Sequence, residues 1–225
     1  MAQKNGRSYN CRGLILFCIV CRAAPVSHYT TIDAQTYWRC AGCHSIFLDQ
    51  THYPSKRKEQ AHYLQHDNRI DDPAYRKFLS RLANPLLAFL KPNDKGLDFG
   101  CGPGPALAKM LNEKGFSMTL YDPFFYPDKS VLKAHYDFIT CTETAEHFHD
   151  PFAEFDRLDS LLKPKGHLGV MTCFLKEGSS FETWHYRRDP THIVFYCETS
   201  FQVIAAQRKW YCQIPSKDVV IFSKK

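Results

Sequence analysis

The sequence contains no long apolar segment, no low-complexity tract and no internal repeat. No apolar run reaches the roughly 18 residues that a membrane-spanning helix requires, so we expect no such helix. A short apolar run at 14–21 follows a basic start, but Arg22 comes directly after it without a small-residue cleavage site. We therefore do not expect a secretory signal, and we predict a cytoplasmic protein. The net charge of +6 permits contact with phosphorylated partners without requiring it.

Ten cysteines are present, and four of them form two C-x2-C pairs: Cys18, Cys21, Cys40 and Cys43. The spacer lies within the roughly 15–20 residues typical of a four-cysteine zinc site, where each pair supplies two thiolates to one tetrahedral ion. We predict a structural Zn²⁺ in a small zinc ribbon. Buried unpaired thiols, a redox dithiol or a disulfide framework are the alternatives. Cys11 and His44 lie near enough in sequence to be substitute ligands, which we do not favour.

A glycine-rich turn occupies residues 97–106, after a short apolar stretch. Its characteristic residues are Asp98, Gly100, Gly102 and Gly104. Glycines let the backbone approach a ligand closely, and a helix that follows presents free N–H groups. The dinucleotide fingerprint G-x-G-x-x-G would place its third glycine at position 105, which is Pro105, so that fingerprint fails.

Two further apolar segments lead into acidic residues. Residues 117–122 form a second apolar stretch ending at Asp122, where a carboxylate can accept both hydroxyls of a ribose. Residues 136–141 form a third, which runs into the stretch 143–147, Glu-Thr-Ala-Glu-His. Asp150 and Pro151 then predict the start of a helix, as Asp72 and Pro73 do earlier in the chain. Pro85 is expected to break or kink that earlier helix.

These motifs resemble motifs I and IV of the class I S-adenosylmethionine-dependent methyltransferases, over residues 75–225. The resemblance implies an α/β fold: a Rossmann-like doubly wound sheet with an antiparallel C-terminal strand pair, plus the small N-terminal zinc ribbon. It implies S-adenosylmethionine as cofactor. The residues that would bind it are Asp98, Gly100, Gly102, Gly104, Asp122, Phe124 and Glu143.

One departure from the family lies between Asp122 and Asp137, where the segment is shorter than usual. We expect the third strand of the family's sheet to be missing or vestigial. The aromatic residues that follow Asp122 would then cover the adenine ring by stacking: Phe124, Phe125 and Tyr126.

Methyl transfer requires alignment of the reactants and, for an oxygen or acidic C–H nucleophile, removal of a proton. Histidine suits that task at neutral pH. We predict His192, His147 and Glu146 as catalytic residues; a capping role in an ordered loop is the alternative for each histidine. The loop 184–196 resembles the Asp-Pro-x-His stretch that roofs the substrate site of ubiquinone-type O-methyltransferases. This implies substrate contacts from Arg187, Arg188 and Tyr196, with plain surface charge as the alternative for the two arginines.

We divide the chain into a zinc ribbon at 1–55, a connector at 56–72 and a methyltransferase domain at 73–225. The favoured acceptor is the O or C of a small metabolite, sugar or quinone-like ring. The alternative is RNA (rRNA or tRNA), with the ribbon and the basic run 56–58 as docking surface, because amino-terminal zinc modules occur both in sugar C-methyltransferases and in a ribosomal-RNA guanine methyltransferase. A second alternative is a non-catalytic zinc-ribbon binding module. The sequence has no Asn-Pro-Pro-Tyr-type motif for exocyclic base nitrogens, which favours a small acceptor.

Overall fold

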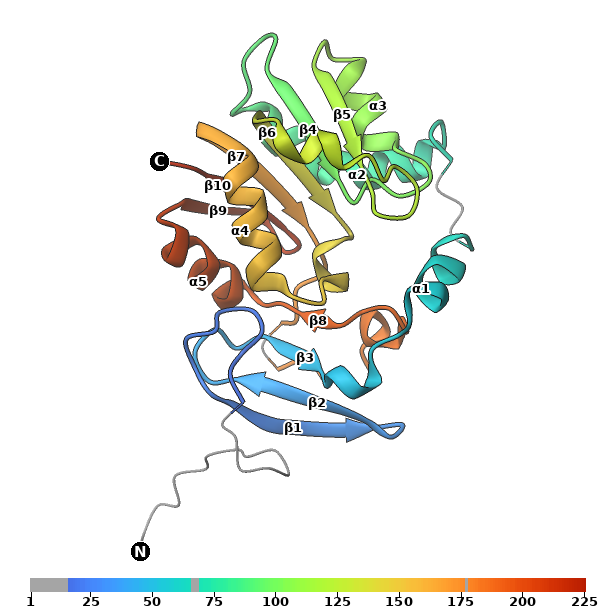
Figure 1. Cartoon of the computed structure of the whole chain (residues 1–225), viewed down its shortest axis with the longest axis vertical. Helices are drawn as coiled ribbons and strands as arrows, with labels where there is room; N and C mark the ends of the chain where they lie inside the picture. Colours follow the sequence, from blue (N-terminus) through green and yellow to red (C-terminus); the bar gives the residue numbers. More distant parts are fainter. Residues whose placement is uncertain (1–15, 66–68, 177) are drawn as a thin grey trace, which may run out of the picture.

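The computed structural model describes residues 16–65, 69–176 and 178–225, and these residues form two β-sheets (Figure 1). The larger sheet has the strand order β5-β4-β6-β7-β10-β9. Its strands are β4 (Lys95–Phe99), β5 (Ser117–Tyr121), β6 (Tyr136–Thr142), β7 (Leu162–Met171), β9 (Tyr211–Ser216) and β10 (Val219–Ser223). The first four run parallel, and β10 pairs antiparallel with both β7 and β9. The predicted Rossmann-like sheet with an antiparallel C-terminal pair is confirmed.

Helices cover both faces of this sheet. On one face α2 (Pro73–Leu87) and α3 (Ala106–Asn112) pack together over an apolar layer. On the other, α4 (Pro151–Leu161) and α5 (Glu198–Arg208) bury a second layer, and α4 stands in front of the sheet in Figure 1. Because both faces are covered, the central strands are buried on both sides, as parallel sheets require.

The predicted helix starts at Asp72 and Asp150 are observed. The Asp72 carboxylate accepts the N–H of Ala74, and the Asp150 carboxylate accepts that of Ala153. A proline occupies the first turn of each helix, where its missing N–H leaves no acceptor unpaired. Pro85 does not end the first helix, which continues to Leu87. The helix tolerates it because Leu79, Leu82 and Leu86 hold one face in the core.

The family's third strand is absent from the described segment between β5 and β6. In its place stand an aromatic turn and the short 3-10 helix η2 (Lys129–Lys133). Strand β5 therefore forms one edge of the larger sheet. The shortness of the sequence between Asp122 and Asp137 predicted this outcome correctly.

The smaller sheet is antiparallel, with the order β1-β2-β3-β8. Strands β1 (Val26–Ile32), β2 (Gln35–Cys40) and β3 (Ile46–Leu48) come from the N-terminal region. Strand β8 (Val194–Phe195) comes from the loop between β7 and α5, and pairs with β3 through Ile46 with Phe195 and Phe47 with Val194. The N-terminal strands thus share a sheet with the C-terminal half of the chain, which the sequence did not reveal.

The remaining elements connect the two sheets. The 3-10 helix η1 (Gln50–His52) and helix α1 (Lys56–Tyr63) lead away from β3 along one side of the molecule (Figure 1). Two more 3-10 helices, η3 (Ala145–His147) and η4 (His185–Arg188), follow β6 and β7 respectively. Among the helices that the structure describes, none is long and apolar enough to cross a membrane.

The apolar core is continuous between the two sheets. One buried cluster contains the paired cysteines and Phe47 together with Phe155 of α4 and Phe201 of α5, which cover one face of the larger sheet. A neighbouring cluster joins Tyr37 and Ile46 of the smaller sheet to Phe195 of β8. Because these clusters contain residues from both regions, we expect the described part of the chain to unfold as one cooperative unit.

Replacement of Ile46 by alanine tests this coupling. Ile46 is fully buried, so the truncation should lower the free energy of unfolding by about 2–5 kcal/mol. In a urea titration, far-UV circular dichroism and tryptophan fluorescence should still report one coincident transition. Leu64→Ala at an exposed site should change the free energy of unfolding by no more than about 0.5 kcal/mol. Two separated transitions would contradict the shared core.

Candidate active site

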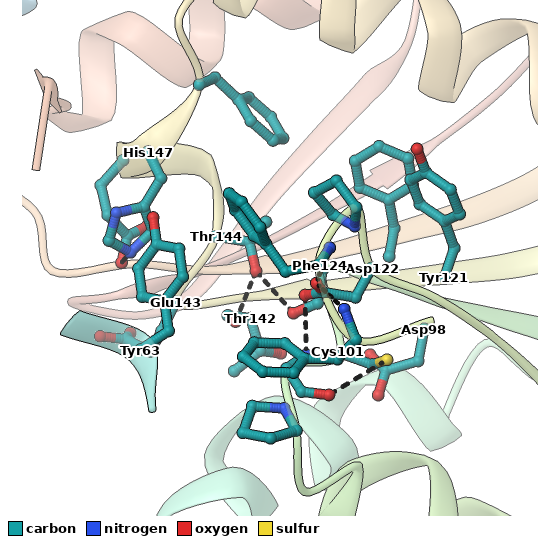
Figure 2. Close-up of a pocket in the computed structure, with 18 of the residues that line it drawn as sticks. Tyr63, Asp98, Cys101, Tyr121, Asp122, Phe124, Thr142, Glu143, Thr144 and His147 are labelled. Carbon is teal, nitrogen blue, oxygen red and sulfur yellow. Dashed lines mark hydrogen bonds and ion pairs between the residues drawn. The ribbon is translucent and has the colours of Figure 1, made fainter. Parts of the chain in front are cut away.

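A cavity of about 740 Å³ lies at the carboxyl ends of β4, β5 and β6. Figure 2 shows Asp98, Cys101 and Asp122 on one side of it and Tyr63, Glu143 and His147 on the other. Ligands of open α/β sheets bind at this edge of the strands. The cavity lining includes ten of the predicted site residues: Asp98, Gly100, Gly102, Gly104, Asp122, Phe124, Glu143, Glu146, His147 and His192.

The glycine turn is held close to the strand beside it. Gly100 and Gly102 have positive φ angles of 76° and 64°, a region that favours glycine. The Gly100 N–H donates to the backbone oxygen of Tyr121 at 2.8 Å, and Thr144 Oγ1 donates to the oxygen of Gly100 at 3.1 Å. A Cβ at Gly100 would lie 2.2 Å from Thr144 Cγ2. Both the positive φ angle and the lack of room for a Cβ atom therefore require glycine at position 100.

Asp122 joins the glycine turn to the aromatic turn after β5. Its Oδ2 accepts the N–H of Gly102 at 3.1 Å, and its Oδ1 accepts the N–H groups of Phe124 at 2.8 Å and Phe125 at 3.1 Å. A carboxylate has about four acceptor positions, so capacity for one further donor remains. This residue organises the cavity as well as lining it.

Two more carboxyl groups in the cavity differ in their partners. Asp98 accepts the Thr140 hydroxyl at 2.7 Å, and burial raises its pKa to about 6. Glu143 has a positive φ of 47°, and Tyr186 Oη lies 3.4 Å from its Oε2. Burial, and then the charge of Glu146, raise the pKa of Glu143 to about 9.

The three predicted catalytic residues converge at the opposite end of the cavity. His147 Nε2 and His192 Nε2 each lie 4.0 Å from Oε1 of Glu146. The two imidazole centroids are 4.8 Å apart. Glu146 is fully buried, and its Oε2 has no hydrogen-bond partner among the described residues. The structure therefore brings these three side chains together into one cluster.

The hydrogen bonds of the two imidazoles define where their lone pairs lie. His147 Nδ1 is 2.9 Å from the backbone oxygen of Thr191, and His192 Nδ1 is 2.7 Å from that of Tyr186. A carbonyl oxygen only accepts, so each Nδ1 carries a proton. In a neutral ring with its proton on Nδ1, the lone pair lies on Nε2. Burial lowers the pKa of His192, which favours this neutral state.

Three residues around this cluster were not among the predicted site residues. Asp189 accepts the N–H of Thr191 at 2.8 Å and contacts His62 Nε2 of the connector at 3.0 Å. Tyr63 packs with a centroid 5.3 Å from that of His147. Tyr186 contacts Glu146 and His192. Asp189 and Tyr186 stood inside the loop that the sequence singled out, whereas nothing in the charged segment around Tyr63 marked it as a site residue.

The three predicted substrate contacts do not line this cavity. Arg187 is buried towards the smaller sheet, with its guanidinium 3.7 Å from Asp33. Arg188 is exposed at the surface. Tyr196 is fully buried, donates its hydroxyl to the backbone oxygen of Ala145 at 3.0 Å and stacks on Phe201. This corrects the expectation that the whole loop roofs the acceptor: only its Asp189 and His192 face the cavity.

The four paired cysteines form a second cluster, within the smaller sheet. Their sulfur atoms lie within 4.8 Å of one another, and all four side chains are buried. The sulfurs of Cys18 and Cys43 are 3.5 Å apart, and those of Cys21 and Cys40 are 3.6 Å apart. These separations are far longer than a disulfide and close to the roughly 3.8 Å expected around tetrahedral zinc. His44 is exposed and not part of the cluster, and Cys11 lies outside the described residues.

Two glycine substitutions separate the cost of a positive φ angle from the cost of a steric clash. Gly115 also has a positive φ, of 91°, but a Cβ there would meet nothing within 4 Å. Gly115→Ala should therefore cost only the left-handed backbone penalty, about 1–2 kcal/mol. Gly100→Ala should cost more, because it adds the clash with Thr144, and should weaken S-adenosylhomocysteine binding at least tenfold. Urea unfolding and calorimetric titration measure both effects. Equal costs for the two variants would contradict the contact.

The sequence and the fold were compared with known proteins. Residues 62–212, more than half of the chain, match the family model described as a methyltransferase domain. No curated protein matches the sequence.

Several solved structures share the fold. The 1,6-didemethyltoxoflavin N1-methyltransferase of Burkholderia thailandensis, with bound 1,6-didemethyltoxoflavin and S-adenosylhomocysteine, is 15% identical, with a TM-score of 0.51 and coverage of 88% of this chain and 99% of that one. The PH0226 protein of Pyrococcus horikoshii is 15% identical, with a TM-score of 0.50 and coverage of 69% and 94%. Magnesium protoporphyrin IX methyltransferase of Synechocystis, with bound S-adenosylmethionine, is 12% identical, with a TM-score of 0.48 and coverage of 78% and 95%.

The family match agrees with the geometry of the glycine turn and with the order of the six strands. The predictions of family, fold class and enzyme type are confirmed. The chain belongs to the methyltransferase family and has the fold of the class I enzymes that use S-adenosylmethionine.

Proposed function

We propose that this enzyme transfers a methyl group from S-adenosylmethionine to an oxygen or an acidic carbon of a small acceptor. The observation that carries the proposal is the position of the His147, His192 and Glu146 cluster. It lines the same cavity as the glycine turn, at the end opposite Asp98 and Asp122. A cofactor on the turn and a proton acceptor facing it are the two elements that such a transfer needs.

The residues of the turn fit the proposed cofactor. Gly100, Gly102 and Gly104 leave room for its amino-acid part, and Asp122 has an acceptor position free for a ribose hydroxyl. The Phe124 ring lines the cavity beside Asp122 and would cover the adenine, in place of contacts from the absent third strand. Glu143 and Asp98 would pair with the ammonium group.

The chain's own residues would align the acceptor and take its proton. When bound, S-adenosylmethionine supplies a methyl group on a positively charged sulfur. The nucleophilic atom of the acceptor would receive that methyl group and give up its own proton. Its proton passes to the Nε2 lone pair of His192, and the carboxylate of Glu146 stabilises the imidazolium that forms. Tyr63 and His147 would enclose the acceptor from the side of α1.

The charges at this end of the cavity favour an uncharged acceptor. Glu146 and Asp189 lie 4.0 Å and 3.8 Å from Nε2 of His192, and the cationic side chains that line the described cavity are Lys56 and Arg157. A phosphate or carboxylate next to His192 would meet acidic groups without a paired arginine. This supports a small hydroxylated acceptor over RNA, although the exposed run 56–58 on α1 keeps the RNA alternative open to test by salt-dependent binding.

For the cysteine cluster we propose a structural Zn²⁺. The backbone N–H groups of Val20 and Cys43 point at Cys18 Sγ and Cys40 Sγ at 3.3 Å, which stabilises thiolates. Cys18, Cys21 and Cys43 lie in the turns beside β1 to β3, and Cys40 is the last residue of β2. An ion bound here would therefore brace the smaller sheet rather than take part in the chemistry.

Replacement of His192 by asparagine tests the proton acceptor. Asparagine can still donate to the Tyr186 oxygen but has no group in the place of Nε2. We expect turnover to fall about 10²–10⁴-fold, while calorimetry shows unchanged affinity for S-adenosylmethionine. Turnover is followed as S-adenosylhomocysteine release with a panel of phenols, catechols and sugars.

His185→Asn is the matched control, because His185 is exposed in the same loop and does not line the cavity. This variant should leave turnover and the affinity for S-adenosylmethionine unchanged. Failure of the wild-type protein to bind S-adenosylmethionine would refute the cofactor assignment. Equal turnover in His192→Asn and the wild type would refute the role of His192.

Metal analysis tests the zinc site. The purified protein should contain about one zinc ion per chain, and Cys40→Ser should lose it and unfold at lower urea concentration. Cys212→Ser, at a half-buried cysteine outside the cluster, should retain the ion. A wild-type protein that unfolds at the same urea concentration with and without metal would contradict the assignment.

A further inference from the structure

Tyr186 lies in η4, is buried, and touches both the acid and the base of the proposed site. We infer that Tyr186 is a positioning residue: its hydroxyl orients Glu146 and its backbone oxygen orients His192, so that the Nε2 lone pair of His192 faces the acceptor. This inference rests on the proposed function, and it adds a residue to which neither the family match nor the neighbours assign a role.

The hydroxyl of Tyr186 is the single hydrogen-bond donor to the Glu146 carboxylate among the described residues. It forms a short contact with Glu146 Oε1, lies 2.9 Å from Thr172 Oγ1, and lies 3.4 Å from Glu143 Oε2. An ionised carboxylate only accepts, so the phenol proton lies towards Glu146 and the Thr172 hydroxyl donates to the phenol oxygen. Burial raises the pKa of Tyr186 well above its usual value, which keeps the hydroxyl a donor.

The backbone and ring of Tyr186 act on His192. The Tyr186 oxygen accepts the His192 Nδ1 proton at 2.7 Å, which selects the tautomer with a free Nε2. The Tyr186 ring lies against the imidazole, with centroids 4.1 Å apart. The backbone oxygen of Tyr186 thus restrains the orientation of the imidazole, and the Tyr186 ring packs against it.

Tyr186 is itself held from two directions. Its ring belongs to the apolar cluster that contains Tyr37 and Ile46 of the smaller sheet. Its hydroxyl is joined to Thr172, whose N–H donates to the backbone oxygen of Asp218 at 3.0 Å in the turn before β10. Because both supports are buried, the position of Tyr186 is determined by packing and not by solvent-exposed contacts.

Loss of the hydroxyl should change how the cluster binds protons. His192 faces Glu146, His147 and Asp189. Glu143 and Tyr63 lie beside these groups, and His62 contacts Asp189. These titratable side chains form one coupled set. In Tyr186→Phe, the buried Glu146 carboxylate loses this hydrogen-bond donor. The set should then take up its first proton at a pH about one unit higher, because the hydrogen bond that stabilised the anion is gone.

NMR provides a readout that does not require the acceptor. Signals of histidine Cε1–H are titrated with pH in protein saturated with S-adenosylhomocysteine, and the His192 signal is identified by its loss in His192→Asn. In Tyr186→Phe we expect the His192 titration to move upward by about one pH unit or more, with the Nδ1–H tautomer and cofactor affinity retained. Once an acceptor is known, the acid limb of the turnover profile should move in the same direction.

Tyr53→Phe is the matched control, because the Tyr53 hydroxyl is buried, has no hydrogen-bond partner within the described part of the chain and lies outside the cluster. Its His192 titration should equal that of the wild type. Thr172→Val serves if Tyr186→Phe does not fold, and should cause a smaller upward shift by weakening the phenol as a donor. An unshifted His192 titration in the folded variant overturns the inference. A wild-type protein that shows no methyl transfer refutes the proposed function instead, and leaves the NMR result to be judged separately.

Discussion

The antiparallel pairing of β3 with β8 connects the two sheets and orients the site between them. Strand β8 begins two residues after His192, and the N–H of Ile193 donates to the backbone oxygen of Glu146 at 2.8 Å. The N–H of Leu48 in β3 donates to the oxygen of Ile193 at 2.9 Å. A continuous set of backbone hydrogen bonds therefore runs from the N-terminal sheet through the loop to η3, and the His–His–Glu cluster forms where these segments meet.

Local chemistry made much of this fold predictable. The glycine turn, the two Asp-Pro helix starts and the paired cysteines each depend on residues close together in sequence, so their patterns could be read directly. The shortness of the segment between Asp122 and Asp137 likewise predicted the missing strand. Helix α2 does not end at Pro85, because burial of Leu82 and Leu86 outweighs the lost backbone hydrogen bond.

The parts that sequence reasoning missed depend on contacts between distant segments. Nothing near Val194 indicates that it pairs with Phe47, and nothing near Tyr63 indicates that it packs on His147. The sequence marks the loop 184–196 as a candidate functional segment, but it does not indicate which of its side chains face the cavity. That depends on β8, because the pairing with β3 buries Tyr196 on one side and leaves His192 towards the cavity.

The smaller sheet also has a consequence for the order of folding. Its first three strands lie near the start of the chain, whereas its fourth strand is Val194–Phe195. During synthesis from the ribosome, the edge of β3 therefore has no partner until most of the methyltransferase region has been made. Closing so long a loop late is entropically costly and slows folding, since non-local pairing correlates with slow rates. Early metal capture by the cysteines would protect the N-terminal strands during that interval.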